Sequence, residues 1–427
     1  MATLAATDER ADRSYGALEG ASPATWRLST RITMIALSLT CLGLVMVASA
    51  AGSREFGSTV VKRLILTAVG LCAFLVGAGV DYQFWRRHQL ALLVLAMAGL
   101  VAVMLPGVSA ARNGARRWIE IGLPMGFQPS EFAKICFCVW VAAYCERNMA
   151  RMRSAVHGFL LPMGVVGFGC LLILAEPDFG TSVLTGCVCL MMLWVMGTRL
   201  IFILASAAAA TPLFMRLVLD VPYRMHRVTS FLDPWSDPRG NGYQLIQSKI
   251  AIGSGGLFGQ GLGTGRQEEG FLPAANNDFV FSIIAEELGF IGAILVVAVF
   301  LLLLWQGIQV VRRSRDPFGF SLALGLTALL GMQAAAHIAV VTGSVPTKGL
   351  ALPFVSAGGS SLIASMLAAG ILVNIARSEE APERHELKSW QAQVPGYEVA
   401  AMDVVSRTGD GIARRIKTLG RSKGSNE

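Results

Sequence analysis

Apolar runs long enough to cross a lipid bilayer recur along the whole chain and restrict what it can fold into. A membrane-spanning helix needs roughly 17–25 mostly apolar residues. About ten runs near this length lie at residues 32–51, 64–80, 90–105, 132–145, 156–175, 180–196, 200–219, 279–304, 318–341 and 352–376. Only 15% of the 427 residues are charged, against roughly 25% in soluble proteins. The sequence therefore predicts an all-α polytopic membrane protein with about ten transmembrane helices.

The basic residues of the short loops predict its orientation, because cytoplasmic loops carry an excess of Lys and Arg. With both termini in the cytosol, the inner loops and tail flanks hold more basic residues than the outer loops and helix mouths, where Arg63 and Lys348 are placed. The net charge of +8 is explained by these inner arginines and by anionic lipid headgroups. It gives no indication of a nucleic-acid partner.

The chain divides into one membrane domain, residues 32–376, between a cytosolic N-terminal tail (1–31) that we expect to be disordered and a cytosolic C-terminal tail (377–427). An extracytoplasmic loop, residues 220–278, separates predicted helices 7 and 8 and is long enough to be functional. We expect short helices within it. All eight cysteines fall within or beside apolar runs, which favours neither a disulfide framework nor a zinc site.

One acidic residue, Asp278, ends the long loop at the mouth of the eighth predicted helix. Carboxylates at or inside the hydrocarbon layer are costly and usually functional. Asp278 suits a general base acting on a sugar hydroxyl, a proton or ion site in a transporter, or a structural helix cap. Glu286 and Glu287 follow about two turns deeper and are expected to hydrogen-bond to neighbouring helices. The residues alone leave all three roles of Asp278 open.

Basic residues near the outer boundary form a candidate anion site. Arg224 and Arg227 are spaced i, i+3, so they either bind a pyrophosphate together or anchor the loop in lipid headgroups. Lys348 is either an anion contact or a snorkelling anchor. The sequence does not choose between these alternatives.

Two further motifs place charges at the same boundary. Glu131 and Lys134, also spaced i, i+3, form either a mutual ion pair or, with Arg117, a charged wall for an anionic ligand. Asp178 follows Glu176-Pro, where a tight turn with a helix cap and a role in the site both fit.

Glycine clusters mark two segments. The run from Gly253 to Gly265 lacks the spacing and the strand context of a phosphate-binding loop, so it predicts close backbone packing or a flexible flap. Gly358-Gly359 predicts close helix packing or an unwound membrane segment.

The order of these motifs resembles the SEDS family (shape, elongation, division and sporulation) over residues 32–376. The matching pieces are Arg117-Trp118, Gln128-Pro-Ser-Glu131-x-x-Lys134, Pro177-Asp178-x-Gly-Thr, Arg224-x-x-Arg227, Asp233-Pro-x-x-Asp237-Pro, Gly242-Tyr-Gln-x-x-Gln247-Ser, Asp278-Phe, Glu286-Glu-Leu-Gly and Leu352-Pro-Phe-x-Ser356. Pro346-Thr-Lys348-Gly-Leu is more similar to the cell-division branch than to the elongation branch.

The resemblance implies a GT-C-like glycosyltransferase that polymerises lipid II into glycan strands, with Asp278 as the catalytic acid–base residue. It implies substrate-binding roles for a further set: Arg117, Glu131, Lys134, Asp178, Arg224, Arg227, Gln244, Lys249, Glu286, Lys348 and Ser356. It names no certain cofactor and leaves open a divalent cation at the pyrophosphate site.

The implied partners are lipid II, an undecaprenyl-pyrophosphate-linked glycan, membrane lipids, a class B penicillin-binding protein and other division proteins. The implied location is the bacterial cytoplasmic membrane at the division septum. An elongation-type polymerase, a lipid II flippase or other transporter, and a scaffold of the division machinery are the alternatives.

The chain departs from the family pattern near the candidate site. The family usually has Glu and His where this chain has Ala274 and Asn276, and Gln where it has Glu176. His337 replaces an Asn, and Ala357 replaces a Tyr. These replacements bear on substrate preference and leave Asp278 in place.

Overall fold

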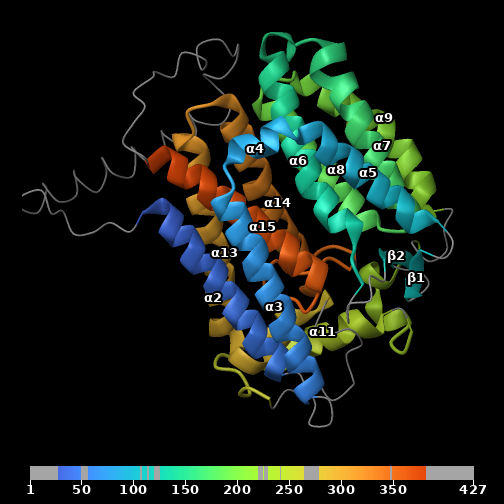
Figure 1. The fold of residues 1–427 in the computed structure, drawn as a ribbon. Coiled ribbons are helices and arrows are strands. Elements are labelled where there is room, and N and C mark those ends of the chain that lie inside the picture. Colours follow the sequence, from blue (N-terminus) through green and yellow to red (C-terminus); the bar gives the residue numbers. More distant parts are fainter. Residues whose placement is uncertain are drawn as a thin grey trace, which may run out of the picture.

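The computed structural model describes residues 27–49, 56–105, 108–112, 115–119, 126–219, 225, 229–240, 242–263, 278–346 and 349–380 (Figure 1). Nearly all of both predicted tails and much of the long loop lie outside these ranges. The expected disorder of the N-terminal tail therefore stays a prediction.

Ten helices of at least 15 residues coincide with the predicted apolar runs within the described ranges. They are α2 (Leu28–Ser49), α3 (Phe56–Gly79), α5 (Gln89–Met104), α6 (Pro129–Asn148), α7 (Leu161–Ala175), α8 (Phe179–Val195), α9 (Leu200–Leu219), α13 (Val280–Arg313), α14 (Pro317–Val341) and α15 (Gly359–Glu380). Six candidate spans are long and apolar enough to cross a membrane, and α5, α8 and part of α9 are shorter apolar helices. The helical membrane architecture is confirmed, while the number of spans stays a prediction.

The helices form two adjoining groups (Figure 1). One contains α2, α3, α13, α14 and α15, and the other contains α5 to α9. Helix α15 is enclosed, with contacts to α2, α3, α6, α13 and α14. Its approach to α3 is close, because a Cβ atom on Gly77 would lie 2.7 Å from the carbonyl oxygen of Leu367. Small residues allow such close backbone packing between membrane helices.

Shorter elements lie at the two ends of the bundle. At one end are the antiparallel strands β1 (Ser109–Arg112) and β2 (Ala115–Ile119), η3 (Pro234–Ser236) and α11 (Tyr243–Ser254), which packs on α13 and α14. At the other end are α4 (Tyr82–Arg87), η1 (Met149–Arg151) and η2 (Val156–Leu160), which continues into α7. The predicted short helices of the long loop are confirmed by α11 and η3.

Helix α13 is interrupted at Gly289, whose φ of 70° is in the left-handed region. The glycine run packs against this break. The Phe290 amide donates to the Gly256 carbonyl at 2.9 Å, and the Gly261 amide donates to the Glu287 carbonyl at 3.1 Å. A Cβ atom on Gly259 would collide with the Glu287 carbonyl. The described part of the glycine run therefore shows the close backbone packing predicted from the sequence.

The connection between α14 and α15 differs from the prediction. A helix was expected from residue 352, but α15 begins at Gly359, and residues 349–358, here termed the connecting segment, are not helical. Arg63 stabilises this non-helical backbone: it is 2% exposed and donates to the carbonyls of Phe354 (3.0 Å), Val355 (3.0 Å) and Ser356 (2.6 Å). Arg63 is therefore buried within the bundle, and its predicted position near the outer membrane boundary stays a prediction.

Replacing Arg63 by Met should destabilise the protein, because it leaves buried carbonyls without a donor. Each such carbonyl costs about 1–3 kcal/mol. Unfolding of the purified protein in detergent measures the loss. Lys62→Met is the matched control, since Lys62 is exposed on the same helix. Equal stability of the two variants would contradict the assigned role of Arg63.

Candidate active site

Asp278 lies against the connecting segment. It is half-buried and directly precedes the buried Phe279 and the start of α13. A Cβ atom on Gly349 would lie 3.1 Å from the Asp278 Oδ2. Residues that are far apart in the sequence thus meet at this carboxylate.

Side chains of α14 hydrogen-bond to the connecting segment next to Asp278. His337 donates from Nδ1 to the Leu350 carbonyl at 2.6 Å, and Gln333 donates from Nε2 to the Ala351 carbonyl at 2.9 Å. Ser356 accepts a hydrogen bond from the Leu352 amide at 2.8 Å. Because polar backbone groups away from water need internal partners, these bonds stabilise a non-helical segment inside the bundle.

The Glu131–Lys134 pair continues this network into α6. Lys134 donates to both carboxylate oxygens of Glu131 at 3.0 Å and to the Gln333 Oε1 at 2.8 Å. Lys134 is 2% exposed and Glu131 is 6% exposed. An ammonium group has three N–H donors, and these contacts use all of them. The structure therefore favours the ion-pair alternative over an anion-binding wall.

Arg117 and Asp178 organise the turn between α7 and α8. Arg117 donates from Nε to the Glu176 carbonyl at 3.0 Å and from Nη2 to the Pro177 carbonyl. Asp178 accepts from the Thr181 amide at 3.2 Å as the N-cap of α8, and from Gln128 at 3.2 Å. The helix-cap alternative for Asp178 is confirmed.

This turn adjoins the connecting segment. A Cβ atom on Gly180 would lie 3.2 Å from the Leu350 side chain. Gln128 also donates its backbone amide to the Ser360 Oγ at 3.0 Å. The α8 cap, the start of α6 and the start of α15 therefore enclose the same region.

The Glu176 carboxyl group is buried without a hydrogen-bond donor from the described residues. The residue is 2% exposed, and both of its Oε atoms are unsatisfied. Burial and, to a smaller extent, the neighbouring Asp178 raise its pKa to about 8, against the opposing effect of Arg117. A neutral carboxylic acid thus occupies the position where the family usually has the neutral amide of Gln.

The other predicted site residues that the structure describes lie on α11 and α13. Glu286 is 1% exposed within α13, and Gln244 lies in the first turn of α11. Lys249 is exposed, and its Nζ would lie 3.3 Å from a Cβ atom on Gly343. Glu287 accepts from the Ser49 hydroxyl of α2 at 2.7 Å, as expected for a buried acid. Arg224, Arg227 and Lys348 lie outside the described residues.

The sequence interpretation missed Gln333 and Gln128 as members of the network. The available signal was a polar side chain within or directly before an apolar run. No group of three or more His, Cys, Asp or Glu residues in the described ranges could hold a metal ion. The divalent cation stays a prediction and enters no step below.

These features define an integral membrane protein with a half-buried carboxylate against a broken helix connection. The family FTSW_RODA_SPOVE, described as "Cell cycle protein", matches residues 29–381. The chain therefore belongs to this family, which confirms the SEDS resemblance.

Individual relatives include FtsW proteins and a sporulation protein. A "Probable peptidoglycan glycosyltransferase FtsW" from Trichlorobacter lovleyi is 44% identical over 351 residues, covering 81% of this chain and 92% of the relative. "Stage V sporulation protein E" from Bacillus subtilis is 38% identical over 352 residues, covering 81% and 96%. The similarity is FtsW-like, as the motifs predicted.

Solved structures share the fold. A chain from "Structural coordination of polymerization and crosslinking by a peptidoglycan synthase complex" is 27% identical, with a TM-score of 0.67 over 82% of this chain and 97% of that chain. The rod shape determining protein RodA of Thermus thermophilus is 24% identical, with a TM-score of 0.61 over the same shares. The predicted SEDS fold is confirmed.

Glu176→Gln should remove a pH-dependent loss of stability. The folded-state pKa of about 8 lies above the ordinary value of 4.5, so the stabilisation is complete below pH 4.5 and is lost as the pH rises to 8. The Gln variant should unfold roughly 2–4 °C above the wild type at pH values above 8. The two proteins should show no such difference near pH 4.5. Parallel melting curves across this range would contradict the buried, neutral carboxyl group.

Proposed function

We propose that the protein polymerises lipid II into glycan strands during cell division, on the outer face of the bacterial cytoplasmic membrane. The observation that carries this proposal is the half-buried Asp278, which lies against a connecting segment fixed by side-chain hydrogen bonds. Relatives named peptidoglycan glycosyltransferase support the reaction class. Asp278 is the general base.

The 4-hydroxyl of lipid II gives its proton to the Asp278 carboxylate, and its oxygen attacks C1 of the lipid-linked glycan. The bond between C1 and the pyrophosphate oxygen breaks, and undecaprenyl pyrophosphate leaves with the bonding electrons. In-line attack inverts the anomeric centre, so an α-linked pyrophosphate gives a β-1,4 bond. A positioned base contributes about 10²–10⁴-fold to such a step.

The leaving pyrophosphate needs cations that are not already paired. Lys134 and Arg117 are engaged inside the protein, which suits a role in positioning the site. Arg224, Arg227 and Lys348, together with the exposed Lys249, are the stronger candidates for binding pyrophosphate. Gln244, on the same helix as Lys249, is a candidate for binding the sugar.

An apolar groove beside this region supports lateral entry of the lipid tail. It has a volume of about 580 Å³ and lies between α11, α13 and α14. Its lining consists mainly of apolar side chains, including Ile252, Leu257, Phe281, Phe290, Val297 and Ile338. Phe281 is in the first turn of α13, so the groove begins close to Asp278.

We further propose that both termini are cytosolic, that the protein acts at the septum, and that residues 32–376 form the catalytic domain. A class B penicillin-binding protein is the proposed partner. The similarity to a chain of a peptidoglycan synthase complex that coordinates polymerisation and crosslinking supports this choice.

Asp278→Asn should abolish polymerisation while leaving folding and partner binding intact, because the amide is nearly isosteric but cannot accept the proton. Because a positioned general base contributes about 10²–10⁴-fold, we expect the rate to fall by at least about 100-fold. The measurement is strand synthesis from lipid II by the purified complex in detergent. Asp81→Asn is the control, because Asp81 caps α4 at the opposite end of the bundle.

Two outcomes would contradict the proposal. Robust synthesis by the Asp278→Asn complex would remove this residue from the reaction. Since detergent abolishes the two sides of a membrane, absence of polymer from the wild type with its correct partner would favour a lipid II flippase.

A further inference from the structure

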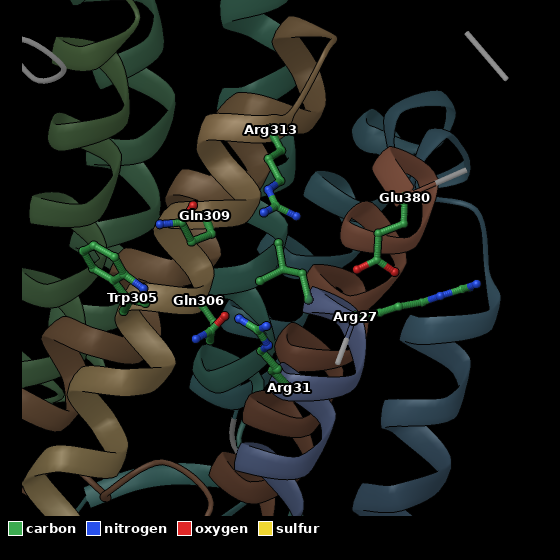
Figure 2. Close-up of a pocket in the computed structure, with 8 residues that line it drawn as sticks. Arg27, Arg31, Trp305, Gln306, Gln309, Arg313 and Glu380 are labelled. Carbon is green, nitrogen blue, oxygen red and sulfur yellow. The ribbon is translucent and has the colours of Figure 1, made fainter. Parts of the chain in front are cut away.

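A second pocket lies at the end of the bundle opposite Asp278. It has a volume of about 520 Å³ and is lined by Arg27 and by residues from α2, α13 and the end of α15. These are Arg27, Leu28, Arg31, Trp305, Gln306, Gln309, Arg313 and Glu380 (Figure 2). None of them takes part in the proposed glycosyl transfer.

The pocket has an excess of positive charge. Glu380 is the single acidic side chain among the described residues that line it, and its carboxylate accepts hydrogen bonds from the backbone amide of Ser29 at 3.0 Å and from the Ser29 hydroxyl at 2.8 Å. Among the described residues, no ion pair joins Arg27, Arg31 or Arg313 to a carboxylate. In Figure 2, Arg31 and Arg313 direct their guanidinium groups towards the space between them, while Arg27 extends away from α13. An anion in this space would relieve the repulsion between these like charges.

A buried polar atom also points to a ligand. Gln306 lines the pocket, is 5% exposed, and has an Oε1 atom with no hydrogen-bond partner among the described residues. Such an atom costs free energy unless a donor reaches it. Arginine binds phosphate oxygens, and an amide oxygen accepts from a hydroxyl. The pocket therefore matches a ligand that carries a phosphate next to a hydroxyl.

The surroundings indicate that this ligand is a membrane lipid. The part of α13 that follows the break at Gly289, residues 290–313, is roughly 36 Å long at about 1.5 Å per residue, against a hydrocarbon layer of about 30 Å. Trp305 lies about 12 Å before Arg313 along the helix axis and is 52% exposed. Tryptophan is enriched at membrane interfaces. Leu301 and Leu302, exposed by 60% and 46%, continue an apolar surface from the pocket into the bilayer. Acyl chains fit this surface, whereas a free phosphate would not use it.

We propose that this pocket binds the headgroup of an anionic glycerophospholipid of the phosphatidylglycerol type. Arg31 and Arg313 bind the phosphate, Gln306 accepts a headgroup hydroxyl, and the acyl chains lie along α13 beside Trp305. With the proposed orientation, the lipid belongs to the cytoplasmic leaflet. The lipid holds α2, α13 and α15 together at the end away from the reaction.

Native mass spectrometry of the full-length protein released from phosphatidylglycerol or phosphatidylcholine nanodiscs tests the proposal. The wild type should retain phosphatidylglycerol in preference to phosphatidylcholine. Each arginine near a membrane surface contributes about a 5-fold gain in binding, so Arg31→Gln with Arg313→Gln should weaken retention about 25-fold. Gln306→Leu should reduce the preference for a hydroxyl-bearing headgroup over phosphatidic acid.

Arg312→Gln is the matched control, because Arg312 is exposed next to Arg313 but does not line the pocket. Melting curves of all variants in detergent establish that they are folded. Equal phosphatidylglycerol retention by the double variant and the control would overturn the proposal. Displacement of the lipid by glycerol 3-phosphate would instead identify a site for a soluble anion and would overturn the lipid assignment. Because lipid retention is the readout, this result is independent of glycosyl transfer.

Discussion

The structure depends on hydrogen bonds that satisfy a non-helical backbone inside a membrane protein. The connecting segment cannot rely on water, so side chains must supply its donors. Arg63 binds three of its carbonyls, and Gln333 and His337 bind two more. A continuous helix would need none of these residues. The presence of these polar side chains in apolar helices therefore indicates that the connecting segment is held in a non-helical conformation.

The same hydrogen bonds explain where the candidate reaction centre lies. Gly349 begins the connecting segment and meets the Asp278 carboxylate, while Gln333 is tied through Lys134 to Glu131. Glu131 and Lys134, which the family resemblance implies as substrate ligands, thus form an ion pair that is hydrogen-bonded to Gln333. In the proposed mechanism, the pyrophosphate is therefore bound by other cations, from the long loop and from the sequence between α14 and α15.

Local sequence patterns predicted much of this arrangement. The helices follow from apolar runs. The Asp178 cap and the Glu131–Lys134 ion pair were each one of two alternatives that the turn residues and the i, i+3 spacing left open. Interactions between distant segments were not predictable. Arg63 and Ser356 are separated by 293 positions, and a buried arginine at the start of an apolar run resembles a helix-mouth residue until its partners are known. The late start of α15 was not predicted for the same reason.

The most direct test is a comparison of lipid II polymerisation by Gly349→Ala and Gly358→Ala. A Cβ atom on Gly349 would lie 3.1 Å from the Asp278 Oδ2, whereas one on Gly358 would meet its nearest atoms at 3.8 Å. If the connecting segment positions the base, Gly349→Ala should slow strand synthesis by roughly 10-fold or more without unfolding the protein, as expected for a displaced catalytic group. Gly358→Ala should retain near-normal rates. Wild-type rates from a folded Gly349→Ala protein would contradict the account.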